Sequence, residues 1–418
     1  MESIRLFVNQ VKSKLASLDD ESDYFRQMEW AMVVAGIRLP SQNSTYQRLF
    51  NCYRILMLLQ FSIWVDRVYV AYTEWNSPGE LIGVVAFCLA LVMILSRVVL
   101  MRVYLKDLLK VRDGLENRLN NHHSEGRVRS YRLIRRFFMV LEWIYLFDQI
   151  ILYAFGINEE RQYSVPDNLR RLSKRSKLGF DIFICSNHFV FSSVYASILT
   201  IMNTVFMGFS TELENIVSEC NGIFERARQQ VTVIPLYEGS SEHTEMRENL
   251  VFWSTLKNEI SLIAERHSEL IEHVATVRNL LKVSFLLIFY TEIVFIGCAL
   301  FYVKLIGITM NTVIVVSYVA SILLECYWFC RLTDNINGTN RAIGFALYNL
   351  DWPIQLCDLP NSRKQYLEIR ASLLVIMTRS QQNLGITCGG MFEMSAQAFD
   401  ELMKMIYSCL MFLLSVTT

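Results

Sequence analysis

Proline is scarce in this sequence, with six residues in a chain of 418. All six fall between long apolar stretches, at Pro40, Pro78, Pro166, Pro235, Pro353 and Pro360. Proline removes a backbone donor and breaks helices from within. Because none lies inside an apolar stretch, each stretch can form one uninterrupted helix.

Charge is also sparse and carries no net sign. Charged residues make up 19% of the chain, against about 25% in soluble domains, and Lys plus Arg equals Asp plus Glu at 40 each. We find no basic run interleaved with aromatic residues, which is the pattern of nucleic-acid-binding proteins. We therefore expect no nucleic-acid partner.

The signatures of catalysis and of metal binding are absent. The sequence has no phosphate-cradling glycine loop, no paired-histidine motif and no nucleophile elbow. Most of its ten cysteines lie in apolar stretches, where free cysteine behaves as a small apolar residue. Cys326 and Cys330 are four apart, but no neighbouring His or Cys pair completes a zinc site. We predict no enzyme activity, no cofactor and no metal site.

Apolar residues are abundant, at 53% of the chain, and they gather in blocks. A helix that spans the hydrocarbon core needs about 20 mostly apolar residues. Residues 1–30 carry charges throughout and do not resemble a signal peptide. The pattern predicts an all-α integral membrane protein with seven transmembrane helices, at 48–72, 80–104, 135–156, 182–209, 283–306, 311–331 and 391–416.

Lysine and arginine in the short connections set the expected orientation, because such residues accumulate in the cytoplasm. The connection 105–134 is strongly basic, whereas the connections after segments one and five and the final tail lack both residues. We expect a cytoplasmic N-terminus and an extracellular C-terminus. The basic stretch 157–180 disagrees, since it would then lie outside. We keep this orientation because the other connections favour it.

The long connection 210–282 has a helical pattern of its own. From Trp253 onward, apolar residues recur in steps of three and four, which predicts a helix with one packed seam: Trp253, Leu256, Ile260, Ile263, His267, Leu270, Val274, Val277 and Leu281. This helix continues into segment five without a breaker. Residues 363–380 form a second amphipathic stretch, too short to span. We expect cytoplasmic helical extensions that pack on each other or on neighbouring subunits.

The last segment carries a polar stripe along one helix face, at Gln397, Glu401, Lys404, Ser408, Met411 and Ser415. A polar stripe on a spanning helix must avoid lipid. It therefore faces either a water-filled path or polar groups of other helices, and the pattern leaves both open. Phe412 and Val416 flank the stripe, where a ring of such residues from several subunits could close a pore by dewetting.

Aromatic and small apolar residues enrich the outer halves of segments two, three, four and six. If they surround a cavity, it suits a small, uncharged organic ligand, and the candidate ligand-binding residues are Val84, Phe87, Cys88, Phe147, Ile151, Phe191, Tyr195 and Tyr318. Plain helix packing is the alternative for each of them. Asn187 and His188 lie in the same region, and we interpret them as hydrogen-bonded filling.

Ionisable residues also occur inside the predicted spans, at Asp66, Arg67, Glu142, Asp148, Glu292 and Glu325. Such residues are functional candidates. We favour structural ion pairs for them, since Asp66 adjoins Arg67 and Glu142 could meet an arginine of another helix.

The C-terminal third resembles the insect odorant receptor family. The similarity lies in Cys326-Tyr-Trp-Phe-Cys, Ala346-Leu-Tyr-Asn-Leu-Asp-Trp, Leu374-Val-Ile-Met-Thr-Arg-Ser-Gln and Ser395-Ala-Gln-Ala-Phe-Asp, which leads into Ser408-Cys-Leu-Met-Phe-Leu-Leu. Arg266-His-Ser-Glu-Leu-Ile also fits the family pattern. The tail departs from it, because Cys409 and Leu410 stand where a Tyr-Phe pair is usual.

The resemblance implies a ligand-gated, non-selective cation channel that assembles as a tetramer with a shared co-receptor subunit. Segment seven then lines the pore, with Ser408, Met411 and Ser415 on its wall and Phe412 and Val416 at a hydrophobic gate. The long cytoplasmic insertion of the co-receptor is missing, so the chain resembles an odorant-tuning subunit. Its implied partners are the co-receptor, a small volatile organic ligand, membrane lipids and permeant cations. Its implied location is the plasma membrane of a sensory dendrite.

The expected organisation has six regions in chain order. They are a cytoplasmic N-terminal region (1–47), transmembrane segments one to four (48–209), a cytoplasmic helical anchor (210–282), segments five and six (283–331), further anchor helices (332–390) and a pore-lining segment seven (391–418).

Two other classes also have many spans. A G-protein-coupled receptor has seven, but the inverted orientation, the missing Asp/Glu-Arg-Tyr of segment three and the proline-free segments six and seven oppose it. A transporter is opposed because no inverted repeat or broken helix pair is visible.

Overall fold

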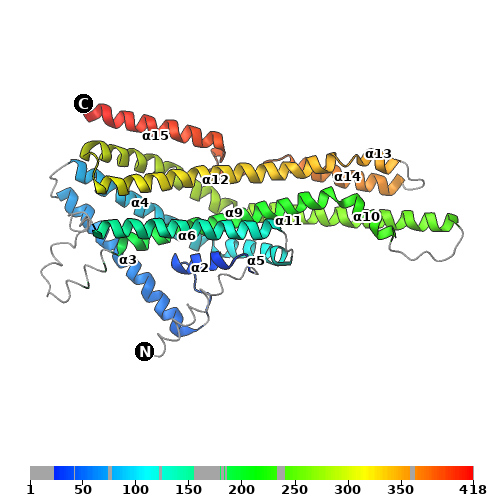
Figure 1. Cartoon of the computed structure of the whole chain (residues 1–418), viewed down its shortest axis with the longest axis horizontal. Coiled ribbons are helices and arrows are strands. Elements are labelled where there is room, and N and C mark those ends of the chain that lie inside the picture. Colours follow the sequence, from blue (N-terminus) through cyan, green and yellow to red (C-terminus); the bar gives the residue numbers. More distant parts are fainter. Residues whose placement is uncertain are drawn as a thin grey trace.

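The chain forms an elongated bundle of helices whose long axis runs the length of the molecule (Figure 1). The computed structural model describes residues 23–41, 43–73, 78–121, 125–154, 179, 183, 186–232, 241–357 and 363–417. In this part of the chain the strands are confined to one short hairpin, β1 (Thr387–Cys388) and β2 (Phe392–Glu393). The expectation of an all-α membrane fold is confirmed.

Seven long helices carry the seven predicted spans and alternate in direction along the long axis (Figure 1). They are α3 (Ser44–Thr73), α4 (Pro78–Val103), α6 (Glu125–Ala154), α9 (Asn187–Asn221), α11 (Ser241–Ile306), α12 (Met310–Tyr348) and α15 (Ala396–Thr417). Among the described residues, α4, α9, α11 and α12 are long and apolar enough to cross a membrane on composition alone. Helices α3, α6 and α15 run beside them in the same bundle and account for the remaining predicted crossings (Figure 1).

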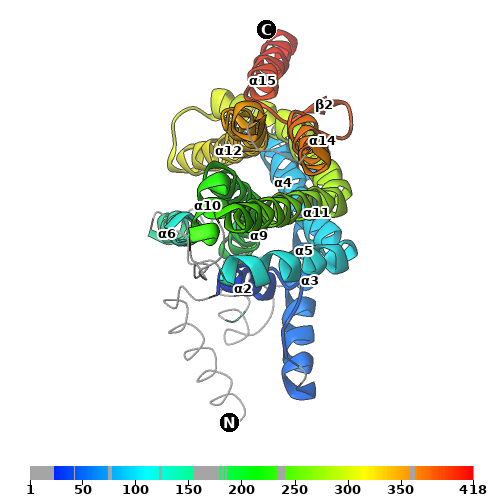
Figure 2. The same ribbon diagram turned by 90° about the vertical axis from the view of Figure 1, so that its right-hand side faces the viewer.

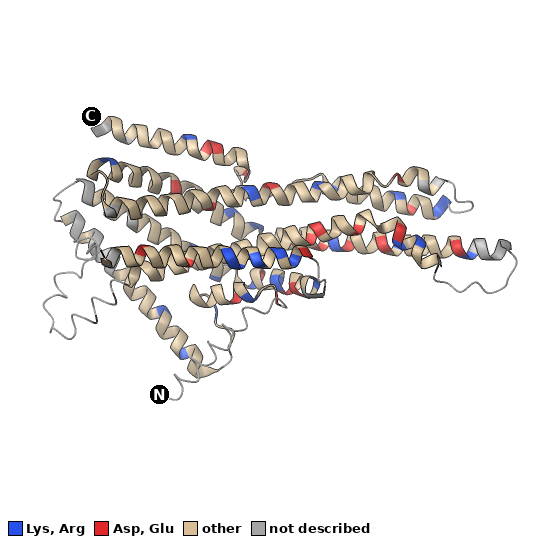
Figure 3. Ribbon diagram, viewed as in Figure 1, with Lys and Arg blue, Asp and Glu red and all other residues tan. Residues whose placement is uncertain are grey.

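Charge divides the bundle along its length. Lys, Arg, Asp and Glu gather over the half that contains the start of α11 and the end of α12, and the opposite half is almost free of them (Figure 3). Three shorter helices complete this charged half: α10 (Ile223–Thr232), α13 (Trp352–Cys357) and α14 (Arg363–Ser380). Because a bilayer core excludes charge, the uncharged half is the membrane-spanning half.

Helix α11 joins the two halves without a break over 66 residues. Every residue of the predicted seam, from Trp253 to Leu281, is buried in the described structure. Helix α11 packs against α10, α12 and α14. It is therefore the central helix of the charged half. The expected helix at 363–380 coincides with α14.

Polar contacts tie α11 to its neighbours at the position of the Arg266-His267 motif. Arg266 Nη2 lies 2.7 Å from Glu212 Oε1 of α9, and Arg266 also pairs with Glu219. His267 Nε2 lies 2.8 Å from Asn340 Oδ1 of α12. Asn340 Nδ2 in turn donates to the carbonyl oxygens of Ser380 and Gln382 at 2.9 and 3.0 Å, which docks the end of α14.

Two helices in the charged part were not expected. The basic stretch 105–134, predicted to be a loop, contains α5 (Leu105–Asn121) and the start of α6. Its helix is amphipathic, with the buried residues Leu108, Val111, Leu115 and Leu119 at steps of three and four. Helix α2 (Arg26–Val34) packs on α9 through buried residues that include Met28.

The last helix begins later than predicted, at Ala396 rather than at residue 391. Gly389 and Gly390 adopt the left-handed values φ 61° and 81°, which glycine tolerates, and they turn the chain between β1 and β2. Asp334 Oδ2 of α12 then accepts a hydrogen bond from Ala396 N at 2.9 Å. From this point α15 projects from the edge of the bundle (Figure 2), with α11 and α12 as its packing neighbours.

Candidate ligand-binding site

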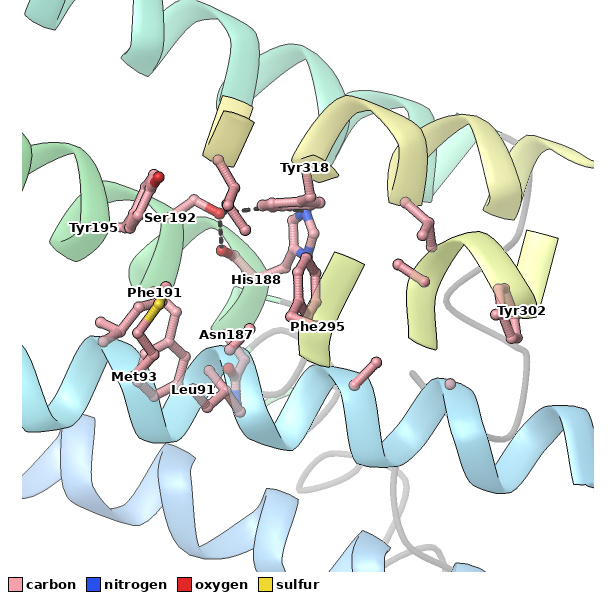
Figure 4. Close-up of a pocket in the computed structure, with 17 residues that line it drawn as sticks. Leu91, Met93, Asn187, His188, Phe191, Ser192, Tyr195, Phe295, Tyr302 and Tyr318 are labelled. Atoms are coloured by element: carbon pink, nitrogen blue, oxygen red, sulfur yellow. Dashed lines mark hydrogen bonds between the residues drawn. The ribbon is translucent and has the colours of Figure 1, made fainter. Parts of the chain in front are cut away.

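A cavity of about 70 Å³ lies in the membrane-spanning half, between α4, α9, α11 and α12 (Figure 4). One face of α4 supplies small residues, Gly83, Ala86 and Ala90, spaced three and four apart so that they leave room. Larger apolar side chains close the other sides, among them Phe191 of α9 and Phe295 of α11. The walls therefore suit a small, mostly apolar molecule.

A ring of hydrogen bonds forms part of the wall of this cavity (Figure 4). The Tyr318 hydroxyl is 2.7 Å from Ser192 Oγ and 2.5 Å from His188 Nε2. Ser192 Oγ donates to the His188 carbonyl oxygen at 2.8 Å, which closes the ring. Residues four apart on α9 are thus joined to α12 across the cavity.

Asn187 occupies the first position of α9 and also lines the cavity. Leu91 of α4 lines the same cavity. Asn187 Nδ2 donates to the backbone oxygen of Gln60 on α3 at 3.0 Å. Its Oδ1 is buried and has no hydrogen-bond partner among the residues that the structure describes.

A buried ion pair adjoins the cavity through Tyr195, which lines it. Arg97 Nη2 of α4 lies 2.8 Å from Glu325 Oε1 of α12, and both side chains are nearly inaccessible. The Tyr195 hydroxyl donates to the other oxygen of Glu325. Glu292 of α11 is fully buried, and within the described structure no N–H or O–H group donates to its carboxyl group.

The ion pair of Glu325 agrees with the interpretation drawn from sequence, whereas Glu142 differs from it. The donor to Glu142 is Ser193 Oγ at 2.9 Å and not an arginine. Asp148 accepts from Ser317 Oγ at 3.1 Å. The side chains of Asp66 and Arg67 lie outside the described residues.

Three of the sequence-predicted ligand residues, Phe191, Tyr195 and Tyr318, come together around the cavity. Val84 is buried and Cys88 is half-buried on α4, but neither lines it. The side chain of Phe87 lies outside the described residues.

The two candidates on α6 do not reach the cavity. Ile151 is half-buried, and Phe147 is 61% exposed. The helix buries Leu141, Tyr145 and Asp148, so Phe147 lies on the outward face. An apolar residue on a membrane helix can face lipid as well as protein, and sequence alone does not separate the two.

Other cavity residues were not singled out by the sequence. Met93 and Ile94 of α4, Ala299 of α11 and Ile322 of α12 lie among ordinary apolar residues. The available signal was the face of small residues on α4, because small side chains at helical spacing leave space between helices. Asn187 and His188, interpreted as filling, are both cavity residues.

On α15, Leu402 and Ile406 are buried against the bundle, and the opposite face is open. The predicted pore residues Ser408, Met411 and Ser415 are exposed, and Phe412 is 65% exposed. The side chain of Val416 is outside the described part of the chain. Lys404 Nζ pairs with Glu401 Oε1 at 2.7 Å on the exposed stripe.

Comparison with solved structures identifies the same fold. The insect olfactory receptor OR5 from Machilis hrabei matches with a TM-score of 0.69 and 12% sequence identity, over 94% of this chain and 98% of that one. The same receptor in complex with eugenol matches with a TM-score of 0.65 and 11% identity, over the same shares of the two chains. At these identities the likeness establishes the fold alone.

Sequence comparison gives the family. Odorant receptor Or2 of Anopheles gambiae is 25% identical over 154 residues, which is 37% of this chain and 38% of that receptor. The family model described as 7tm Odorant receptor matches residues 77–407, which is most of the chain and includes the cavity and most of α15. The chain belongs to the 7tm odorant receptor family.

Proposed function

We propose that this chain is the odorant-tuning subunit of a ligand-gated, non-selective cation channel, and that a small volatile molecule binds in the cavity between α4, α9, α11 and α12. The observation that carries the proposal is this enclosed, mostly apolar cavity. It occurs in a fold shared with an olfactory receptor whose structure has been determined with eugenol. Family membership also agrees with the expectation that the chain is not an enzyme.

The open face of α15 supports the channel part of the proposal. In the described structure this face is exposed at Ser408, Met411, Phe412 and Ser415. A polar stripe on a membrane helix needs water or polar groups beside it. In a tetramer with the co-receptor, this face lines the pore over 391–418, and Phe412 and Val416 form its hydrophobic gate.

The charged half is the proposed anchor, at 210–282 and 332–390, with the N-terminal region 1–47 on the same side of the membrane. The basic residues of α5 and the start of α6 support a cytoplasmic position for this side. The two sets of crossings, 48–209 and 283–331, then lie in the plasma membrane of a sensory neuron. The C-terminus is extracellular.

Binding would act on the gate through the helices that the cavity touches. Helices α11 and α12 line the cavity and are also the packing neighbours of α15. A ligand that fits the cavity better when these helices have moved apart biases the molecule toward that arrangement. In this conformation the cavity is wider and α15 has moved so that the gate is open.

Recording currents tests the function. Cells that express this chain with the insect co-receptor should give a fast inward cation current on exposure to volatile odorants, with no contribution from G proteins. The co-receptor alone should respond only to its own activator. A response that depends on G proteins would favour a G-protein-coupled receptor. The absence of any odorant current across a broad panel would contradict the channel proposal.

The gate assignment has its own test. Phe412→Ser should raise the basal current or alter cation permeation, because a polar ring no longer excludes water at the constriction. Met403→Ser is the matched control, since Met403 is an exposed residue of α15 on another face of the helix. Unchanged basal current and permeation in Phe412→Ser and in Val416→Ser would exclude the gate at these positions.

A further inference from the structure

The polar part of the cavity wall offers more hydrogen-bond acceptors than donors. It consists of Asn187, His188, Ser192 and Tyr318. A serine hydroxyl has one proton, and Ser192 Oγ gives it to the His188 carbonyl oxygen at 2.8 Å. The 2.7 Å contact between Ser192 and Tyr318 therefore has Tyr318 as its donor. The Tyr318 oxygen is left to accept from His188 Nε2 at 2.5 Å.

This order of donation fixes the imidazole as the tautomer protonated on Nε2. It also uses every proton of the ring inside the ring, from His188 Nε2 to Tyr318, to Ser192 and back to the His188 carbonyl. None of these three protons is therefore available to a ligand. Breaking the ring to release a proton would forfeit a hydrogen bond in a low-dielectric site.

Asn187 adds a stronger acceptor to this polar part of the cavity wall. Its amide orientation is fixed, because Nδ2 donates at 3.0 Å to the backbone oxygen of Gln60, which can only accept. The side-chain oxygen is consequently the buried atom without a partner among the described residues. Buried acceptors in native proteins are almost always hydrogen-bonded. An unpaired acceptor in the wall of a cavity therefore indicates that a bound ligand supplies the donor.

We propose that this receptor selects ligands that carry one hydrogen-bond donor on an apolar body, namely small alcohols and phenols, and that the donor bonds to Asn187 Oδ1. Ethers, esters and ketones of the same shape leave that oxygen unpaired. The inference rests on the proposed function, because it specifies the ligand class of the same cavity. The cavity is small in this structure, and an apolar cavity of about 150 Å³ is known to hold benzene. The ligand therefore widens the cavity as it enters and exposes the Asn187 oxygen.

Isomeric odorants test the proposal on the wild-type chain. The pairs 4-ethylphenol with 4-methylanisole and 1-hexanol with methyl pentyl ether have the same atoms and differ in the donor. With the co-receptor present and free aqueous concentrations matched, the donor isomer should activate at a concentration at least about tenfold lower, since one unmade hydrogen bond at a buried group has this effect. Equal potency within both pairs would overturn the proposal.

Two variants locate the selectivity. Asn187→Leu should bring the potency ratio of each pair close to one, because the unpaired oxygen is gone. Tyr318→Phe should also shift the ratio toward the ether, because the proton of His188 Nε2 loses its acceptor and becomes available to the ether oxygen. Gln60→Leu is the matched control. It removes hydrogen bonds from the Gln60 side chain to Phe183 O and Ser186 Oγ, leaves the backbone oxygen that holds Asn187, and should preserve the ratio.

The outcomes separate this inference from the proposed function. Odorant-evoked currents without preference for donor isomers, or a preference that persists in Asn187→Leu, overturn the ligand class and leave the channel assignment in place. Failure of the wild-type chain to respond to any odorant, while the co-receptor still answers its own activator, overturns both.

Discussion

At the scale of single residues, the buried ion pair of Arg97 and Glu325 should have a large effect on stability. The two side chains join α4 to α12 within the membrane-spanning half, where water cannot replace either partner. Tyr195 completes the coordination of Glu325. Removing one member of a buried ion pair leaves an uncompensated charge, which is far more costly than removing both.

We therefore expect Arg97→Met to lower the free energy of unfolding by about 3 to 5 kcal/mol. The double variant Arg97→Met with Glu325→Gln should recover much of this loss, because a neutral amide oxygen still accepts from Tyr195. Thermal unfolding of the purified protein in lipid nanodiscs measures the effect. A double variant no more stable than the single one would show that the charge of Glu325 is not the source of the loss.

His267 provides a residue-scale prediction in the charged half. Burial lowers the pKa of its imidazole below the ordinary value of 6.5, against the opposing effect of the hydrogen bond to Asn340, and the nearby charge of Arg379 lowers it further. The folded chain thus binds this proton less readily than the unfolded chain does. The stability that depends on neutral His267 is present above the ordinary pKa and is lost as the pH falls below it.

Comparing thermal stability at about pH 7.5 and about pH 5.5 tests this linkage. His267→Gln retains an Nε2 donor for Asn340 and cannot be protonated, so its stability should fall less on acidification than that of the wild type. An identical acid-induced loss in both proteins would assign the effect to other groups, such as His273, whose pKa burial also lowers.

At the scale of elements, the docking of α14 on α12 depends on a close approach at Gly344. A Cβ atom there would lie 2.4 Å from Ser380 Oγ and 2.7 Å from Gln381 Nε2. Both residues lie where α14 ends, beside the carbonyl oxygens that Asn340 binds. An alanine at this position would displace both side chains, and the buried Ser380 hydroxyl would lose its hydrogen bond to the carbonyl oxygen of Met377.

Gly344→Ala should therefore destabilise the charged half by about 1 to 3 kcal/mol, as overpacking does. Gly338→Ala on the same helix is the control, because nothing lies within 4 Å of its added Cβ, and it should be neutral or slightly stabilising through helix propensity. Hydrogen exchange of the α14 amides reports the difference. Equal protection of α14 in the two variants would contradict a close approach at Gly344.

The sequence predicts elements wherever the pattern is long. Hydropathy locates the seven long helices, and the repeat from Trp253 to Leu281 predicts the buried seam of α11 over its full length. Helix α2 was not predicted because it is short, and α5 was not predicted because it is rich in charge. Both helices pack on larger neighbours. The start of α15 was placed too early, because an apolar run does not show where a glycine turn ends.

The cavity is less predictable than the helices around it. Phe191 and Tyr195 could be named because α9 is buried on most sides, so that large residues there meet other helices. Tyr318 lies on the part of α12 that faces α9. Phe147 on α6 is exposed and does not line this cavity. The sequence could not show this, because lipid and protein favour the same residue types. The unpaired oxygen of Asn187 depends on a backbone carbonyl more than 100 positions away in sequence, which no local pattern contains.

At the scale of the whole molecule, the alternating helices place the ends of α6, α11 and α15 on one side of the membrane and the charged half on the other (Figure 1). The proposed orientation puts the charged half in the cytoplasm. The sequence has two N-glycosylation acceptor sequences, Asn43-Ser-Thr and Asn337-Gly-Thr. In this orientation both stay unmodified, because glycosylation occurs on the opposite side of the membrane. Asn337 is in addition buried, and its Oδ1 accepts from Leu384 N at 3.0 Å.

Glu160→Thr creates an acceptor sequence with Asn158 and Glu159, in the connection between α6 and α9. We expect this variant to gain one glycan in microsomal membranes, seen as a mobility shift that a glycosidase reverses. The wild-type chain should show none. A glycan on the wild-type chain that disappears with Asn43→Gln would reverse the orientation.

The unbroken course of α11 also affects how this receptor can diversify. Phe295 at the cavity and Arg266 in the charged half belong to one helix, and at 1.5 Å per residue they lie roughly 43 Å apart. Substitutions so far apart, with no shared neighbours, contribute independently to stability. Substitutions at the cavity end of the helix can therefore change ligand preference while the other end keeps its contacts. Ligand specificity can then change during evolution in a chain that still folds.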